Sequence, residues 1–111
     1  MAVYEMRIYV CAPGRIGALH NRFRTITTRK FKEHGIEVIG YWTDKYGESN
    51  RLTYICKYDD EAAREKAWAA FRADPEWAAA AKSSTAPENG GEIVANVINT
   101  LMVPTDYSEL Q

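Results

Sequence analysis

Glu5, Arg7 and Tyr9 are the residues whose types and spacing are best suited to chemistry in this sequence. Residues 3–10 alternate in the manner of a strand, so these three side chains share one face of it. In a central strand, buried charges must be paired and hydrogen-bonded. One hypothesis is that Glu5 and Arg7 pair with each other or across a dimer and fix the register. The other is that Arg7 offers a fork of N–H donors to an anionic group and Tyr9 donates to a ligand.

Aromatic residues on two other predicted strands are candidates for lining one ligand pocket together with Arg7 and Tyr9. Tyr54 and Cys56 share one face of a predicted strand over 51–58. Neighbouring residues on a strand point to opposite sides, so either Tyr41 or Trp42 points toward the pocket, and Trp42 is included as a candidate. A pocket of this composition would suit a small aromatic or quinone-like ligand, with plain core packing as the alternative.

The two histidines and two cysteines give no indication of a metal centre. His20 lies on the apolar stripe of a predicted helix over 15–34, which suits a core or lid histidine or, alternatively, a catalytic one. No second histidine or carboxylate is placed near His20 or His34 to argue for a metal. Cys11 and Cys56 are far apart in the sequence, which favours reduced thiols in a cytoplasmic protein. We expect no cofactor, because no glycine-rich phosphate loop is present.

The composition indicates one globular domain and argues against nucleic-acid binding and against a membrane span. The chain has 111 residues, of which 46% are hydrophobic and 12% aromatic, so it can bury a core. Its 14 basic and 15 acidic residues nearly cancel, which leaves no electrostatic footprint for nucleic acid. No apolar run approaches the roughly 20 residues that span a bilayer. Charges among the first ten residues argue against a secretion signal.

The hydrophobic periodicity predicts a β-α-β-β-α-β order of elements. Gly35 after the first helix and Asp74-Pro75 between the last two helical segments are typical end and start signals. The predicted strands cover 3–10, 36–43, 51–58 and 93–103, and the predicted helices cover 15–34, 61–73 and 74–82, with a loop over 83–91 and a flexible tail over 104–111. This order is typical of a single α+β domain, residues 1–111, with a ferredoxin-like antiparallel four-stranded sheet and its helices on one face.

Both faces of the predicted sheet are apolar, although the helices can cover only one of them. In the last strand, Val97 and Leu101 lie on one parity while Ile98 and Met102 lie on the other. Leaving such side chains in water forfeits about 1.5–3 kcal/mol each. We therefore expect a homodimer that forms through the uncovered face, because symmetric dimers are the commonest oligomers. The alternative is that long loops or the tail cover this face.

An ordered set of short motifs resembles the NIPSNAP family. The motifs are Y-E-M-R-I-Y at 4–9, Pro13-Gly14, H-G-I at 34–36, G-Y-W-T at 40–43, Gly47 with Asn50, and A-D-P-E-W at 73–77. The resemblance implies a dimeric α+β barrel, in which two ferredoxin-like sheets close face to face. It implies no particular reaction, because the family has no firmly assigned chemistry. Family members often have H-L-W in the third strand, where this chain has Tyr54, Ile55 and Cys56.

These observations predict a homodimeric domain that binds a small apolar or aromatic molecule, or a protein partner, between its two sheets. The candidate ligand-binding residues are Glu5, Arg7, Tyr9, Trp42, Tyr54 and His20. The alternative is a cofactor-independent dimeric-barrel enzyme, a monooxygenase or isomerase acting on an aromatic or lactone substrate. That alternative is an analogy between folds, and fold does not determine function.

Overall fold

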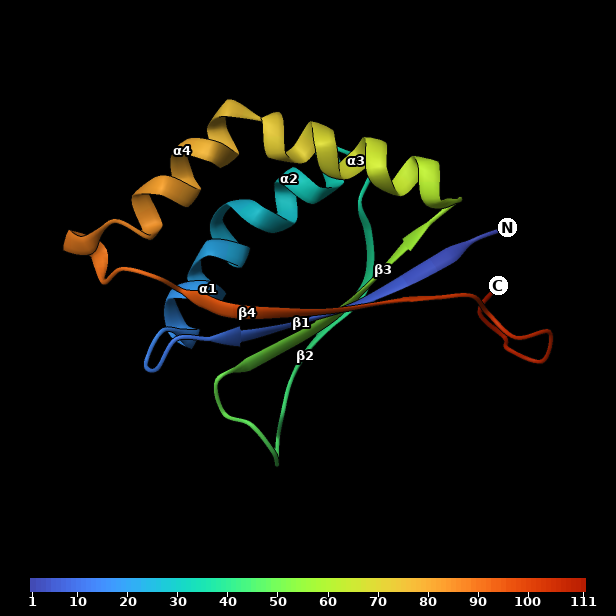
Figure 1. Ribbon diagram of the computed structural model, residues 1–111, viewed down its shortest axis with the longest axis horizontal. Coiled ribbons are helices and arrows are strands. Elements are labelled where there is room, and N and C mark those ends of the chain that lie inside the picture. Colours follow the sequence, from blue (N-terminus) through green and yellow to red (C-terminus); the bar gives the residue numbers. More distant parts are fainter.

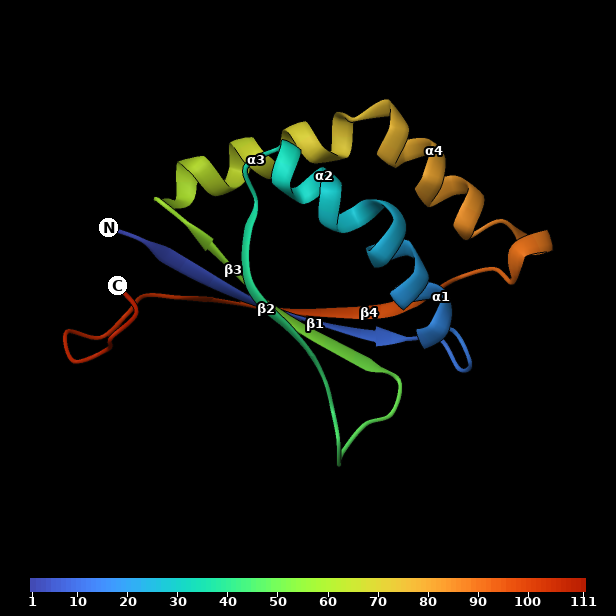
Figure 2. The ribbon, with the colours of Figure 1, turned by 180° about the vertical axis from the view of Figure 1, so that it is seen from behind.

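Four antiparallel strands form one sheet, and all helices lie on one side of it (Figures 1 and 2). The computed structural model describes residues 1–111. The strands are β1 (Val3–Cys11), β2 (Glu37–Thr43), β3 (Arg51–Tyr58) and β4 (Val94–Met102), in the spatial order β2-β3-β1-β4. The predicted ferredoxin-like α+β fold is thereby confirmed.

The register of β1 against β3 determines which side chains face the helices. Glu5 lies opposite Cys56, and Arg7 lies opposite Tyr54. Residues directly opposite each other in an antiparallel pair share a face. Every second residue of β3 is buried, including Cys56 and Tyr54, so Glu5 and Arg7 lie on the helix-covered face. The opposite side of the sheet, called here the helix-free face, carries the alternate residues of β1, including Ile8.

The first helical segment is continuous but not uniformly α-helical. It consists of α1 (Ile16–Arg22), a π-helical turn (Phe23–Thr27) and α2 (Thr28–Glu33), where one α-helix was predicted. Within it, the hydroxyls of Thr27 and Thr28 donate to carbonyl oxygens five residues earlier, at 3.3 and 3.0 Å. These bonds help to satisfy the carbonyl groups of a widened turn. The segment ends at Glu33, and Gly35 beyond it has a φ of 78°, the left-handed conformation expected just after a helix.

Aspartate caps begin both later helices, as their sequence signals predict. Asp60 accepts a hydrogen bond from the backbone N–H of Ala63 (2.7 Å) and precedes α3 (Glu61–Ala73). Asp74 caps α4 (Pro75–Ser84), which has proline at its first position. The predicted loop 83–91 begins later than expected, because α4 extends to Ser84 and a short 3-10 turn follows over Pro87–Asn89.

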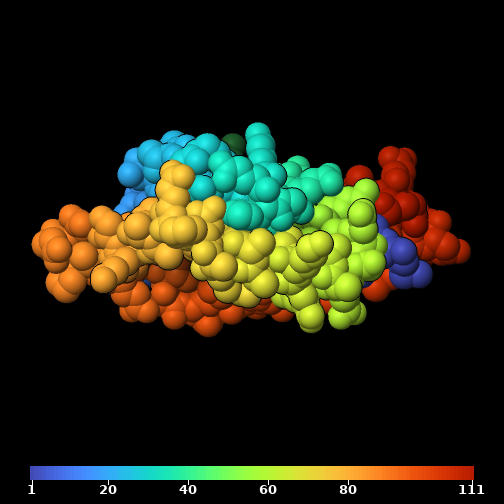
Figure 3. All heavy atoms as spheres, turned by 90° about the horizontal axis from the view of Figure 1, so that it is seen from above, coloured from blue at the N-terminus to red at the C-terminus, as the bar shows by residue number.

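The hydrophobic core lies between the helices and the helix-covered face. Aromatic rings of α2 and α3 meet there, with Phe31 edge-on to Trp68 at 5.3 Å between ring centroids and Phe71 at 5.0 Å from Phe31. Cys11 and Cys56 are buried within it as free thiols. Seen from the helix side, α1 and α2 lie beside α3 and α4, and part of β4 remains visible beyond α4 (Figure 3). No helix has both the length and the apolar character needed to cross a membrane.

The chain after β4 folds back toward the helix-free face. The Tyr4 hydroxyl donates to the backbone oxygen of Gln111 (3.2 Å), and the Gln111 amide donates to the carbonyl oxygen of Thr105 (2.9 Å). The tail, for which the sequence predicts flexibility, contacts its own sheet near one end, and both termini lie on the same side of the molecule (Figure 1).

Candidate functional site

The expectation that Glu5, Arg7, Tyr9 and Tyr54 face a second sheet is wrong. These side chains lie on the helix-covered face, inside one protomer: Glu5 is paired with Arg64 of α3, and the Tyr9 and Tyr54 rings lie 6.1 and 5.6 Å from a phenylalanine of the first helical segment. The alternation of β1 was predicted correctly. The prediction of which side the helices cover was wrong. Periodicity separates the two faces of a strand, but it does not tell which face the helices pack on.

Glu5 is the centre of a fully satisfied hydrogen-bond network. Its carboxylate accepts from Arg7 Nη1 (3.0 Å), Arg64 Nε and Nη2 (3.1 and 2.8 Å), the Tyr58 hydroxyl (2.8 Å) and Asn99 Nδ2 (2.7 Å). Burial by itself would raise the pKa of Glu5, but the hydrogen bonds from Arg64, Asn99 and Tyr58 and the charge of Arg7 lower it to about 2. Glu5 is therefore an ionised acceptor with no free lone pair directed at a ligand.

Arg7 is held by the other half of the same network. Its Nε donates to the Tyr54 hydroxyl (2.9 Å), its Nη2 donates to the Tyr9 hydroxyl (3.4 Å), and the two hydroxyls lie 2.7 Å apart. The Trp68 ring lies 4.3 Å from the guanidinium carbon, which adds a cation–π contact. Of the two hypotheses for Glu5 and Arg7, the geometry agrees with an ion pair within one chain, at 3.0 Å.

His20 and Trp42 lie away from this network and from each other. His20 is half-buried on α1 and lines a cleft of about 190 Å³ together with Phe23 and Tyr41. Tyr41 takes the helix-covered side of β2, and Trp42 takes the helix-free side. The Trp42 ring lies over Gly40, where a Cβ atom would come within 2.5 Å of it. Glycine at position 40 therefore gives this ring its room.

An apolar cavity of about 310 Å³ lies on the helix-free face, where the tail meets the sheet. It is lined by Tyr4, Ile39, Ile55, Met102, Val103, Pro104, Thr105, Ser108 and Leu110. Sequence reasoning missed these residues because four of the nine belong to the tail, whose path depends on contacts such as that between Tyr4 and Gln111. The available signal was the apolar helix-free side of β1 and β4, which includes Ile8 and Met102.

A second cleft, between α1 and α4, contains Arg15 and Arg22. Their spacing of seven residues places them on one side of the chain two turns apart, which is the signal that could have identified them. Neither was singled out from the sequence, because the basic and acidic residues balance over the whole chain.

One group of potential metal ligands was not expected from the sequence. Ligand atoms of Glu33, His34 and Asp74 lie within 4.8 Å of one another, so a carboxylate does lie beside His34. However, Lys30 Nζ is 2.9 Å from Asp74 Oδ2 and 3.0 Å from Glu33 Oε2. Hydrogen bonds to Asp74 and Glu33 raise the pKa of Lys30 above its ordinary value. The ammonium group thus already supplies the positive charge that these carboxylates require.

Fold and site together define a ferredoxin-like α+β domain with a buried ionic network beneath its helices and an apolar helix-free face. The NIPSNAP family model matches residues 4–109, so the chain belongs to the NIPSNAP family. It is 33% identical over 75 residues to mouse Protein NipSnap homolog 3B, a stretch that is 67% of this chain and 30% of that protein. The chain therefore matches less than a third of the length of this relative.

Solved structures of the same family share the fold. A NIPSNAP family protein from Agrobacterium tumefaciens strain C58 has a TM-score of 0.84 at 20% identity, covering 100% of both chains. An uncharacterized NIPSNAP-like domain protein from Burkholderia xenovorans has a TM-score of 0.82 at 20% identity, covering 96% of this chain and 88% of that one. A further Agrobacterium tumefaciens member of unknown function reaches 0.84 at 24% identity, covering 99% and 94%. At these identities the likeness concerns the fold alone.

Proposed function

We propose that this chain is a homodimeric small-molecule-binding domain, in which two copies meet through their helix-free faces and enclose the apolar cavity of each. The observation that carries the proposal is the exposed apolar character of that face. Ile39, Trp42 and Ile98 retain 39, 50 and 46% of their surface exposed. They come from both edge strands, so the apolar surface extends across the whole sheet.

The tail does not provide a sufficient cover for this face. It reaches the end of the sheet near Tyr4, where it helps to form the cavity. Trp42 and Ile98 remain exposed despite it. A second copy of the same face would remove both from water on each protomer, at roughly 25 cal/mol per Å² of apolar area buried. A two-fold axis makes such a contact self-complementary.

The chemistry of the cavity favours a small apolar or aromatic ligand. Six of its nine lining residues are hydrophobic, and its polar groups include the hydroxyls of Tyr4, Thr105 and Ser108. Apolar walls with a few placed polar groups are typical of small-molecule sites. The lining offers no carboxylate, imidazole or thiol to act as a base or nucleophile. We therefore favour binding over the dimeric-barrel enzyme. In this proposal the site still lies between two sheets, but its residues differ from those expected from the sequence.

Paired lysine variants on β4 test this proposal. Ile98 and Val97 are neighbours of similar exposure, but Ile98 lies on the helix-free face and Val97 on the helix-covered side. Ile98→Lys should shift the dimer to monomers in analytical ultracentrifugation, because it places a charge in the interface core. Val97→Lys should remain a dimer, since the same charge then points away from the contact.

The uncharged dye Nile red tests the cavity in the same preparations. Its fluorescence should increase saturably with the wild-type chain and with Val97→Lys, and should lose saturation with Ile98→Lys. Equal binding by Ile98→Lys and wild type would place the ligand site outside the dimer contact. No saturable signal from the wild-type chain would contradict the apolar binding site.

A further inference from the structure

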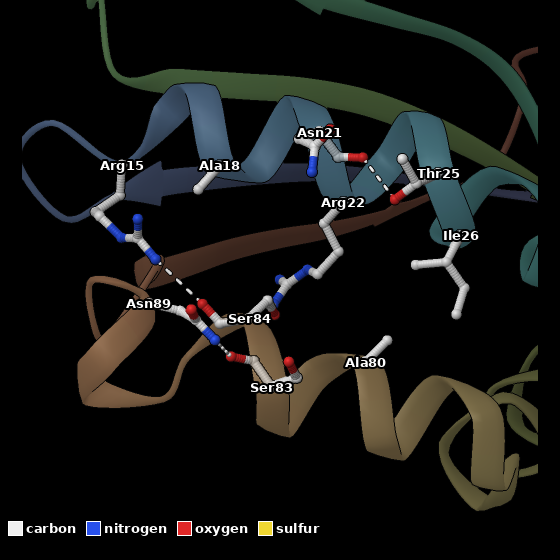
Figure 4. A pocket seen from close by; sticks show the side chains of 10 residues that line it. All are labelled: Arg15, Ala18, Asn21, Arg22, Thr25, Ile26, Ala80, Ser83, Ser84 and Asn89. Atoms are coloured by element: carbon white, nitrogen blue, oxygen red, sulfur yellow. Dashed lines mark hydrogen bonds between the residues drawn. The ribbon is translucent and has the colours of Figure 1, made fainter.

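A polar cleft of about 360 Å³ lies between α1 and α4, on the helix side of the molecule (Figure 4). It is lined by Arg15, Ala18, Asn21, Arg22, Thr25, Ile26, Ala80, Ser83, Ser84 and Asn89. Figure 4 shows the side chains of Arg15, just before α1, and of Arg22, at the end of α1, reaching toward Ser84 on α4. Because it lies on the opposite side of the sheet from the apolar cavity, it does not depend on the proposed dimer.

Arg22 has unused hydrogen-bonding capacity in this cleft. Its only side-chain hydrogen bond runs from Nη1 to Ser84 Oγ (3.1 Å), and its Nε is buried without a partner. The Trp77 ring lies 5.2 Å from the guanidinium carbon and supports its apolar face. A buried donor without an acceptor is unfavourable, most of all on a charged group, so each such atom in a native protein needs an explanation.

Arg15 is held in place by backbone oxygens, and no carboxylate lines the cleft beside its guanidinium. Its Nη2 donates to the carbonyl oxygens of Ser84 and Gly91, both at 3.1 Å. Gly90, at a φ of 105°, lies so close that a Cβ atom there would be 2.6 Å from Arg15 Nη1. The absence of a side chain at position 90 thus leaves room for the guanidinium. Carbonyl oxygens position this group but supply no counter-charge.

Neither arginine forms a salt bridge, in contrast to Arg7, Arg29 and Arg64 elsewhere in the chain. No aspartate or glutamate lines the cleft. Burial lowers the pKa of Arg22, and the nearby charge of Arg15 lowers it as well. Two like charges that share a partly enclosed cleft repel each other, and a bound anion would relieve this repulsion.

We propose that this cleft binds the carboxylate or phosphate head of a small organic anion, with Arg22 as its principal ligand and Arg15 as the second. Guanidinium groups recognise planar or tetrahedral oxyanions through paired N–H donors. The side chains of Asn21, Ser83 and Asn89 are additional polar groups in the lining. Ala18, Ile26 and Ala80 provide an apolar wall for a short carbon skeleton.

Titration with three probes of similar size tests this assignment. Benzoate and phenyl phosphate carry the two candidate heads on the same ring, and benzyl alcohol is the uncharged control. The backbone amide resonances of Ser84 and Asn89, which line the cleft, report binding in every ¹⁵N-labelled chain, including Arg22→Gln. In the wild-type chain the Nε–Hε resonance of Arg22, assigned by its loss in Arg22→Gln, is followed as well. At least one anion should shift these resonances saturably and should bind more weakly as salt is added. Whichever anion binds more tightly identifies the head group.

Three variants separate a specific site from general charge attraction. Arg22→Gln should weaken anion binding by about tenfold or more. Arg24→Gln removes an exposed positive charge two residues away, outside this cleft, and should change affinity by less than about twofold. Ala80→Phe fills the cleft from α4 while keeping both arginines, so it tests the site even if Arg22→Gln destabilises the fold, and it should also abolish binding.

Several results would overturn the assignment. The first is the absence of a saturable shift with either anion. The second is an equal loss in Arg24→Gln and Arg22→Gln, because attraction would then follow net charge rather than a site. The third is full affinity in a folded Ala80→Phe chain. Binding of benzyl alcohol as tight as that of benzoate would likewise show that the ring, and not the charge, is recognised.

Discussion

Glu5→Gln is the substitution that most directly probes the buried network. The Glu5 side chain is inaccessible to solvent and accepts hydrogen bonds from four residues. Glutamine has nearly the same shape but no charge, and its amide nitrogen would face donors instead of accepting from them. Arg7 would then retain a buried positive charge without a counter-ion.

The expected loss of stability is a large part of the total. Removing one partner of a buried ion pair costs about 3–5 kcal/mol. A domain of this size has a free energy of unfolding of about 5–15 kcal/mol. With a urea dependence of roughly 2 kcal/mol per molar, the midpoint of unfolding should fall by about 2 M. Urea titration at one fixed protein concentration, followed by tryptophan fluorescence, measures this shift, because Trp68 packs against Arg7.

The stability difference should also depend on pH with a defined sign. The pKa of Glu5 is lowered in the folded state from 4.5 to about 2. A lowered carboxyl pKa stabilises the fold fully above the unfolded value and loses this contribution as pH falls through the folded value. The wild-type and Glu5→Gln curves should therefore be furthest apart above pH 4.5 and should converge as pH approaches 2.

Glu37→Gln provides the matched control for this prediction. Glu37 is exposed on β2 and forms no salt bridge, so its substitution should change stability by less than about 0.5 kcal/mol. If Glu5→Gln costs less than about 1 kcal/mol, or if the two curves run parallel at all pH values, Glu5 does not hold the network together as described.

Two further predictions concern other parts of the chain. Asp74→Ala should lower Tm by more than about 5 °C, because it removes the cap of α4 and leaves Lys30 and His34 without their shared acceptor. Differential scanning calorimetry measures this shift, and an unchanged Tm would contradict the prediction. Cys11 and Cys56 should resist a thiol-labelling reagent at pH 8 until the chain is unfolded in urea. Both thiols are buried, and burial raises the pKa of each, that of Cys56 to about 11. Labelling of the native chain as fast as the unfolded chain would refute this prediction.

Most of the fold could be predicted from local patterns. The alternation of β1, the glycine after the first helical segment and the aspartates that cap α3 and α4 are properties of neighbouring residues. Such signals are readable from a sequence because each depends on the backbone within a few positions. The order of elements then left few topologies open, and the ferredoxin-like one is observed.

The candidate site was less predictable because its contacts join distant positions. Glu5 meets Arg64 and Asn99, which are 59 and 94 residues away. Pairing between such partners cannot be read from periodicity, so Glu5 and Arg7 were assigned to the wrong face. His34 and Asp74 meet across 40 residues in the same way.

Hydrogen bonds from side-chain hydroxyls to the backbone explain why the first helical segment contains a π-helical turn where a uniform α-helix is predicted. The hydroxyls of Thr27 and Thr28 donate to backbone carbonyls at a π-helical turn, whereas the apolar stripe alone predicts an uninterrupted α-helix. The spacing of hydrophobic residues reports which side is buried, but it is too coarse to detect one widened turn.

Sedimentation equilibrium of the unmodified chain over a range of micromolar concentrations tests the proposed dimer most directly. Pairing through the face that carries Trp42 and Ile98 predicts a species of twice 12.6 kDa that dissociates only on dilution. A mass of 12.6 kDa throughout that range would show that the apolar face remains in water, and would contradict the proposed dimer and the cavity enclosed by it.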